Sequence, residues 1–134
     1  MEILIFAETD DKGNLKKDAY EIASYASKIS SENGGTVNAL CFNASNAETL
    51  SNYGVNKIIN SKNEKLKNFD PGNYSKCISE VFNNENCNLL LLSSSSNSKY
   101  IGGVLSVLID ASYVTNVISK LNYGEKKTVV RNTF

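Results

Sequence analysis

The sequence contains no histidine, and this absence excludes several kinds of site at once. Ser-His and Cys-His nucleophile pairs, imidazole general bases and imidazole metal ligands are all ruled out. Cysteine is scarce too: Cys41, Cys77 and Cys87 contain no C-x-x-C pair, and their number is odd. We therefore expect three reduced cysteines that pack as small apolar side chains and form no disulfide, metal or redox centre.

Excess charge of either sign is also missing, because 14 Lys and Arg residues balance 14 Asp and Glu residues. This balance argues against binding to nucleic acid or to an anionic membrane surface, since both need clustered positive charge. No apolar run approaches the ~20 residues of a membrane span. Glu2 follows Met1 where a signal peptide would carry lysine or arginine. We expect one soluble cytoplasmic domain, residues 1–134 (in the mitochondrial matrix if the source is eukaryotic), with no insertion into a membrane.

The most informative stretch that is present is a run of four leucines at residues 89–92. Because it has no polar face, this run is typical of an interior strand of a parallel sheet. Small polar residues follow it, and a helical pattern then places apolar residues at Ile101, Val104, Leu105, Leu108 and Ile109. Open α/β sheets bind ligands beyond the carboxyl ends of their strands, so this junction is the first place to look for a site.

Strand-like and helix-like segments alternate along most of the chain. Apolar runs predict strands over residues 3–7, 36–42 and 55–59, before the leucine strand. Signals for helix starts lie between the strands, in the pairs Asp18 with Glu21, Ser45 with Glu48, and Asp70 with Pro71. This order predicts an α/β fold with a doubly wound, mostly parallel sheet and helices on both faces.

The last segment changes character. Residues 117–121 and 128–134 resemble two strands around a turn at residues 122–125, which predicts a terminal β-hairpin. The pattern stops at Phe134 inside the second strand, without a cap or a polar tail. We therefore expect the chain to be part of a longer protein.

The crevice at the carboxyl ends of the strands offers candidate ligand groups but no convincing catalytic set. Its candidates come from the end of the first strand and from the serine loop: Ala7, Glu8, Ser94, Ser95, Ser96 and Lys99. Serine hydroxyls and backbone N–H groups at a helix N-terminus can hold a phosphate. The loop lacks the glycines of a dinucleotide loop and the Gly-Lys-Ser/Thr of a P-loop, so we favour a strand-to-helix connection with N-capping serines. The acids Glu8, Asp10 and Asp11 favour a solvated turn over a metal site.

Several segments, taken in their order along the chain, carry a family resemblance. They are the opening strand with its acid at residues 3–8, the acidic-glycine loop before Leu15, the serine-rich turn between Leu89 and Lys99, the stretch from Asp110 to Ile118, and the ending at residues 130–134. Over its whole length the chain resembles the N-terminal domain of the electron transfer flavoprotein alpha subunit.

That resemblance implies a Rossmann-like fold related to adenine-nucleotide α-hydrolases, and a heterodimer with a beta subunit. It also implies electron transfer from flavoprotein dehydrogenases to a membrane quinone oxidoreductase. In the family, FAD is held mainly by a separate C-terminal domain of the alpha subunit, so no cofactor is expected on this chain. The family usually has a glycine before the loop lysine and an arginine further along that helix, where this chain has Ser98 and Val104.

Two hypotheses about function follow. The first is a non-catalytic scaffold or docking domain of an electron transfer flavoprotein alpha subunit, which is not an enzyme. The alternative is a stand-alone adenine-nucleotide-binding module of the universal-stress-protein type, which would use the serine loop for adenylate. A reading frame that continues past Phe134 into a second α/β domain would favour the first hypothesis, and a stop codon there would favour the second.

Overall fold

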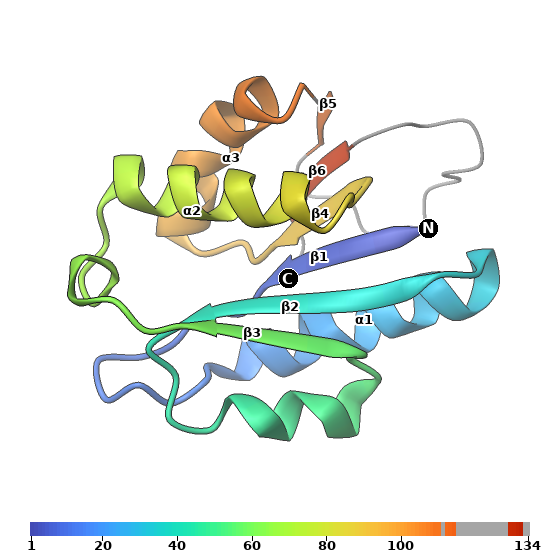
Figure 1. Cartoon of the computed structure of the whole chain (residues 1–134), viewed down its shortest axis with the longest axis horizontal. Helices are drawn as coiled ribbons and strands as arrows, with labels where there is room; N and C mark the ends of the chain where they lie inside the picture. Colours follow the sequence, from blue (N-terminus) through green and yellow to red (C-terminus); the bar gives the residue numbers. More distant parts are fainter. Residues whose placement is uncertain (111, 115–128, 133–134) are drawn as a thin grey trace.

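The computed structural model describes residues 1–110, 112–114 and 129–132 of the chain (Figure 1). Their strands form a six-stranded sheet in the order β3-β2-β1-β4-β6-β5, and each pair of neighbours is parallel. The strands are β1 (Glu2–Phe6), β2 (Thr36–Phe42), β3 (Lys57–Ser61), β4 (Leu89–Leu92), β5 (Ser112–Val114) and β6 (Val129–Asn132).

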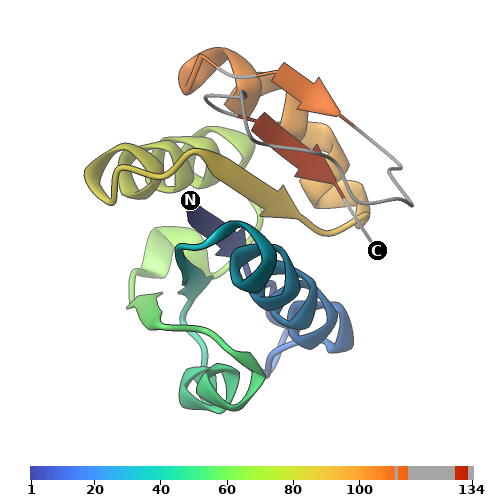
Figure 2. The ribbon, with the colours of Figure 1, turned by 90° about the vertical axis from the view of Figure 1, so that its right-hand side faces the viewer.

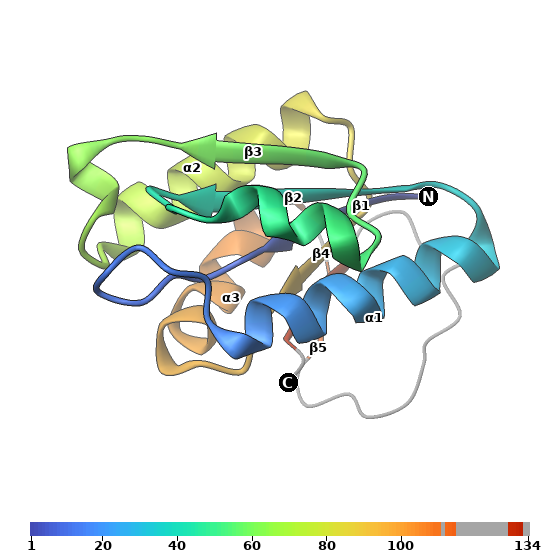
Figure 3. The ribbon, with the colours of Figure 1, turned by 90° about the horizontal axis from the view of Figure 1, so that it is seen from below.

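Helices cover both faces of this sheet (Figure 2). The face seen from below in Figure 3 carries α1 (Lys17–Asn33) and the 3-10 helix η1 (Ala47–Tyr53). The opposite face carries α2 (Pro71–Asn84) and α3 (Ser96–Leu108), and the one-turn helix η2 (Glu64–Leu66) precedes α2. The doubly wound, Rossmann-like α/β class predicted from the sequence is confirmed.

The alternation of side chains along the central strands divides the core into two layers. Ile3 and Ile5 of β1 pack with the α1 layer, whereas Leu4 and Phe6 pack with the α2 and α3 layer. The leucines of β4 are fully buried and contribute alternately to the two layers. In the sheet Ile3 pairs with Leu89 and Ile5 with Leu91. The prediction that these two apolar strands lie side by side at the centre is therefore confirmed.

Of the three predicted helix starts, one is confirmed and two differ from the structure. Asp70 caps α2 as predicted, because its Oδ1 accepts from the backbone N of Asn73 at 3.0 Å and Pro71 is the first helical residue. The Asp18 capping box is wrong: α1 begins at Lys17, two residues before the start that an N-cap at Asp18 predicts, and its N-cap Lys16 makes no side-chain cap. Asn46, and not Ser45, precedes η1, and its Oδ1 instead accepts from the backbone N of Leu15 at 3.1 Å.

Two further differences concern strand positions. The third strand begins at Lys57, two residues after the predicted start at residue 55. The reason is that Gly54 is in the left-handed region and that the side-chain Oδ1 of Asn56 accepts a hydrogen bond from the backbone N of Val37. The first strand of the predicted terminal hairpin, residues 117–121, and its turn lie outside the described residues. Within the second predicted strand the structure has β6, which pairs in parallel with both β4 and the unpredicted β5.

Among the helices of the described residues, none combines the length and the apolar character needed to cross a membrane.

Candidate functional site

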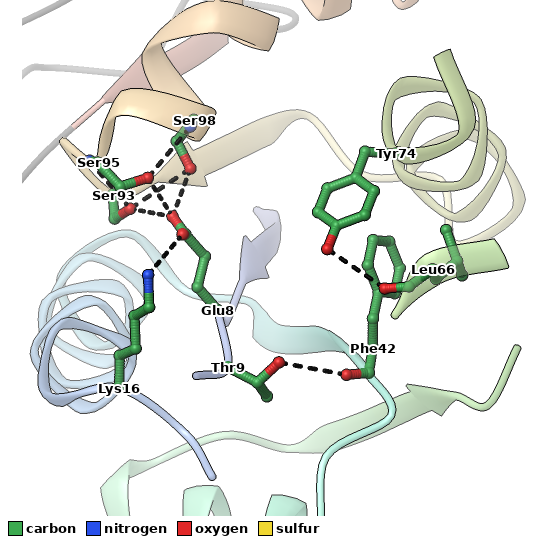
Figure 4. A network of polar contacts seen from close by, with 9 residues as sticks. All are labelled: Glu8, Thr9, Lys16, Phe42, Leu66, Tyr74, Ser93, Ser95 and Ser98. Carbon is green, nitrogen blue, oxygen red and sulfur yellow. Dashed lines mark hydrogen bonds and ion pairs between the residues drawn. The ribbon is translucent and has the colours of Figure 1, made fainter. Parts of the chain in front are cut away.

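The side chain of Glu8 is the centre of the polar contacts at the carboxyl end of β1 (Figure 4). Its Oε2 accepts hydrogen bonds from the hydroxyl groups of Ser93, Ser95 and Ser98, the last two at 2.6 Å. The Nζ of Lys16 lies 3.5 Å from Oε1 on the other side of the carboxylate. Glu8 is only 7% exposed, so a buried carboxylate is enclosed by four donor groups of its own chain.

The parallel sheet and the start of α3 bring these groups together. Glu8 and Ser93 follow the neighbouring strands β1 and β4, so their side chains emerge at the same edge of the sheet. Ser95 is the N-cap of α3, and its Oγ accepts from the backbone N of Ser98 at 3.1 Å. The helix turn thus places the Ser98 hydroxyl beside that of Ser95, at the end of the helix where the dipole favours an anion.

The ionised form of Glu8 is favoured in spite of its burial. Loss of solvation raises the pKa of Glu8, but the hydroxyls of Ser93, Ser95 and Ser98 and the charge of Lys16 lower it by more, so the pKa lies below its ordinary value. The reason is that each donor stabilises the charged carboxylate more than the neutral acid.

The pKa of Asp18, in the first turn of α1, is shifted in the opposite direction. Burial and the charge of Glu8 raise the pKa of Asp18, and the charge of Lys16 and a hydrogen bond from the Ser93 side chain offset only part of this. Its Oδ1 is buried and has no hydrogen-bond partner among the described residues. Proton loss is therefore easy at Glu8 and disfavoured at Asp18.

The donor set around Glu8 does not fit the phosphates of a nucleotide or of FAD. A phosphate at this helix start would need the hydroxyls that already donate to Glu8, and it would bring its negative charge against a buried carboxylate. The position that the sequence proposed for an anion is occupied by the carboxylate of Glu8.

A cleft of about 690 Å³ opens beside Glu8, above the carboxyl ends of β1 and β2. One wall is aromatic: the Tyr74 ring packs edge-on against Phe42 and Phe69, with centroids 4.8 and 5.1 Å apart, and its hydroxyl donates to the Leu66 carbonyl. Burial and the charge of Glu8 raise the pKa of Tyr74. The rest of the lining has both signs of charge: Asp10, Asp11, Lys12, Lys16 and Lys67.

The structure brings together only part of the residues proposed from the sequence. Glu8 and Ser95 are in contact, and Ala7 is buried, with its backbone N on the Leu40 carbonyl. Ser94 is half-buried, and Ser96 and Lys99 are exposed in the first turn of α3. The interpretation of Ser95 as an N-cap is confirmed. Glu8 is not the solvated turn acid that was expected, because three hydroxyls satisfy its charge inside the fold.

Sequence reasoning missed Lys16, Ser93 and Ser98 as partners of Glu8. The spacing of Ser95 and Ser98, three residues apart at a helix start, was a usable signal that both hydroxyls face the same side. No local signal points to Lys16, which reaches Glu8 because its backbone N is fixed to the Glu8 carbonyl at 3.0 Å.

Clusters of three or more Cys, Asp or Glu side chains with the spacing of a metal site are absent from residues 1–110 and the described strands β5 and β6. The fold and site therefore define a doubly wound α/β domain in which an internal carboxylate fills the usual anion position. The model of the electron transfer flavoprotein domain matches residues 3–134, and the chain belongs to that family. No curated protein gave a match to the sequence.

Family membership gives the chain a role related to electron transfer by flavoproteins, in a family of electron carriers. The match covers almost the whole chain, in agreement with the resemblance stated from the sequence. It does not favour the alternative of a universal-stress-type nucleotide module.

Proposed function

We propose that this chain is the N-terminal domain of an electron transfer flavoprotein alpha subunit and acts as a non-catalytic scaffold. In this role it docks with the beta subunit and supports electron transfer from flavoprotein dehydrogenases to a quinone oxidoreductase. The observation that supports the proposal most directly is the filled anion position. A crevice occupied by Glu8 and its four donors is suited to rigid structure and not to the turnover of a ligand.

We further propose that FAD is held outside this chain. The serine hydroxyls that could hold a pyrophosphate are committed to Glu8. The sequence also lacks a glycine-rich dinucleotide loop. The chain's own contribution to the complex would then be to present surfaces and to fix the geometry of its partner.

The experiment for the partner is a capture assay on the intact chain. The chain is co-expressed with an affinity-tagged electron transfer flavoprotein beta subunit, and the captured material is quantified; the control replaces the chain by an unrelated α/β domain. We expect the tagged beta subunit to capture this chain in equimolar amount and not to capture the unrelated domain. Failure to capture it, with both proteins folded by circular dichroism, would refute the docking role.

The experiment for the cofactor is to mix the chain with FAD, remove free ligand by gel filtration and record the visible spectrum. We expect no flavin absorbance near about 450 nm, a band that belongs to the cofactor itself. An established flavoprotein, treated identically, controls for loss of ligand on the column. Stoichiometric absorbance with this chain would contradict the scaffold role.

A further inference from the structure

A small hollow continues the cleft inward, toward Glu8. It has a volume of about 40 Å³, and five of its lining residues also line the cleft: Thr9, Lys16, Phe42, Tyr74 and Asn97. Glu8 lines the hollow as well, and in Figure 4 its side chain lies on one side of this space and the Tyr74 ring on the other. We call this space the inner hollow. It has room for about three atoms of the size of a water molecule.

The two oxygens of the Glu8 carboxylate differ in how many hydrogen bonds they accept. Oε2 accepts from all three serine hydroxyls, whereas Oε1 has one neighbour, the Nζ of Lys16 at 3.5 Å, which is at the limit of a hydrogen bond. Within the described residues no other donor contacts Oε1. Each carboxylate oxygen can accept two hydrogen bonds. Because Glu8 is buried and its ionised form is favoured, Oε1 would bind a further N–H donor strongly.

The charges around the inner hollow favour a neutral donor over an ion. Lys16 already places an ammonium group beside Oε1, so a second cation there would be repelled. An anion would face the carboxylate of Glu8 itself. The negative charge of Glu8 acts across the hollow, since burial and this charge together raise the pKa of Tyr74. A neutral N–H₂ group can donate to Oε1 without either repulsion.

A carbonyl group beside that N–H₂ would find donors in the same place. The Asn97 side chain lines both the inner hollow and the cleft, and it makes no hydrogen bond within residues 1–110. Its own N–H₂ can therefore donate to a ligand, and the Nζ of Lys16 is a second donor. An acceptor (Glu8) and a donor (Asn97) on one small space are the complement of a primary carboxamide. The carbon, oxygen and nitrogen of that group also match the size of the inner hollow.

The aromatic wall of the cleft continues outward from the inner hollow. The Tyr74 ring is held in place by its edge-on contacts with Phe42 and Phe69 and by the bond from its hydroxyl to the Leu66 carbonyl. A planar ring attached to the carboxamide would lie against this fixed wall in an offset or edge-on contact. The volume of the cleft falls within the about 300–1,000 Å³ of small-molecule sites. Its position at the carboxyl ends of parallel strands is where open α/β sheets bind ligands.

We propose that the cleft binds a small aromatic primary carboxamide. The amide N–H₂ donates to Oε1 of Glu8, and the amide carbonyl accepts from Asn97. The ring lies against Tyr74 and Phe69 in the cleft. This site uses the free side of the carboxylate and leaves the serine bonds of Oε2 intact, so it differs from an adenylate site on the serine loop. The proposal concerns binding without conversion and does not rest on the docking role of the chain.

The test is a titration of the intact, nitrogen-15-labelled chain followed by two-dimensional NMR, with three probes of nearly the same shape. Benzamide should shift the backbone N–H signals of the residues that line the cleft and should saturate, with a dissociation constant of about 0.1–1 mM for a ligand of this size. Acetophenone has a methyl group in place of the N–H₂ and should bind at least about 10-fold more weakly, because it gives Oε1 no donor. Benzoate should not saturate, since its charge would face Glu8.

Two variants test the residues. Glu8→Gln should weaken benzamide at least about 10-fold and remove its advantage over acetophenone, because an amide N–H₂ would then occupy the place of Oε1. Asn97→Ala, at an exposed position of α3, should weaken benzamide about 3- to 10-fold and decides the matter if Glu8→Gln is unfolded by circular dichroism. The matched controls are Glu48→Gln and Asn52→Ala, on exposed positions of η1, which should bind like wild type.

Four outcomes would overturn the proposal. They are the absence of saturable shifts with benzamide, equal binding of acetophenone or of benzoate, undiminished binding of benzamide to folded Glu8→Gln, and undiminished binding to Asn97→Ala.

Discussion

Ser98 Oγ donates to the carboxylate of Glu8 at 2.6 Å, although 90 positions separate the two residues in the sequence. The bond joins the end of the first strand to the first turn of α3. With the bonds from Ser93 and Ser95 it fixes the start of α3 on the edge of the sheet. The contact is both a structural anchor and the reason why the crevice does not offer those hydroxyls to a ligand.

Replacement of Glu8 by glutamine is expected to destabilise the fold by about 1–3 kcal/mol at neutral pH, because charge-assisted hydrogen bonds are lost and an amide N–H₂ faces hydroxyl donors. Urea unfolding followed by circular dichroism measures the change. Asp11→Asn, the same kind of substitution on an exposed neighbouring acid, should leave the midpoint nearly unchanged. Equal stability of Glu8→Gln and wild type would mean that the serine contacts contribute nothing net.

The same variant gives a test by pH. Because the folded pKa of Glu8 is lowered, its ionisation stabilises the fold above the unfolded value, near 4.5, and this stabilisation is lost as the pH falls through the folded pKa. The stability difference between wild type and Glu8→Gln should therefore be constant from pH 7 to about pH 5.5 and shrink below 4.5. Unfolding midpoints across this range provide the measurement. A difference that grows on acidification has the wrong sign for a lowered pKa.

Asp18→Asn is expected to stabilise the domain slightly at neutral pH. The substitution removes a carboxylate whose folded pKa is raised by burial and by Glu8. Since the raised pKa means that the carboxylate opposes folding above that value, the gain should shrink as the pH falls toward the ordinary value of 3.8. Thermal melting at several pH values measures the difference in stability between wild type and Asp18→Asn, with Asp11→Asn again as the control. A clear loss of stability at pH 7 would show that the helix-start position of Asp18 outweighs its burial.

Leu91→Asp should unfold the domain, with a loss of more than about 4 kcal/mol, because it buries an unpaired carboxylate in the central strand. Leu91 is fully buried in the α1 layer. The variant should lose its cooperative melting transition in circular dichroism, whereas Lys62→Asp in an exposed loop should keep it. A cooperatively melting Leu91→Asp would contradict the observed place of β4 in the sheet.

The three cysteines should react slowly with a thiol reagent in the native protein. Burial raises the pKa of Cys41 to about 11, and burial with the nearby acids Glu2 and Glu85 raises that of Cys87 to about 12. Cys77 is half-buried, and burial raises its pKa as well, so it should react first of the three. Mass spectrometry at successive times gives the order in which the three cysteines are labelled. Labelling in urea gives the reaction rates of the same cysteines in the unfolded chain. Rapid native labelling of Cys41 or Cys87 would contradict their burial.

The sequence was sufficient for features that depend on local pattern. The leucine run identified β4, the apolar run rich in β-forming residues at 36–42 gave the bounds of β2, and Asp70 with Pro71 gave the start of α2. These succeed because burial on both faces and helix capping each leave a mark within a few residues.

The arrangement around Glu8 could be predicted only in part. The meeting of Glu8 with Ser95 followed from placing two strand ends at one crevice, but its burial depended on the contacts of β1 and β4, which no local pattern encodes. Lys16 illustrates the same difficulty. Its partner is set by a loop that returns to the Glu8 carbonyl, and its own neighbours in the sequence gave no sign of this.

The central place of β1 also has a consequence for the order in which the chain can fold. Residues 2–61 can assemble β1, α1, β2, η1 and β3 from neighbours in sequence, which completes much of the α1 layer. Leu4, Phe6, Leu40 and Phe42 on the other face must wait for α2 and β4, since the pairing of Ile3 with Leu89 spans 86 positions. Contacts of such separation slow folding. A chain emerging from the ribosome would therefore have one largely complete face and one exposed apolar face until the leucine strand arrives, and that interval is when it most needs a chaperone.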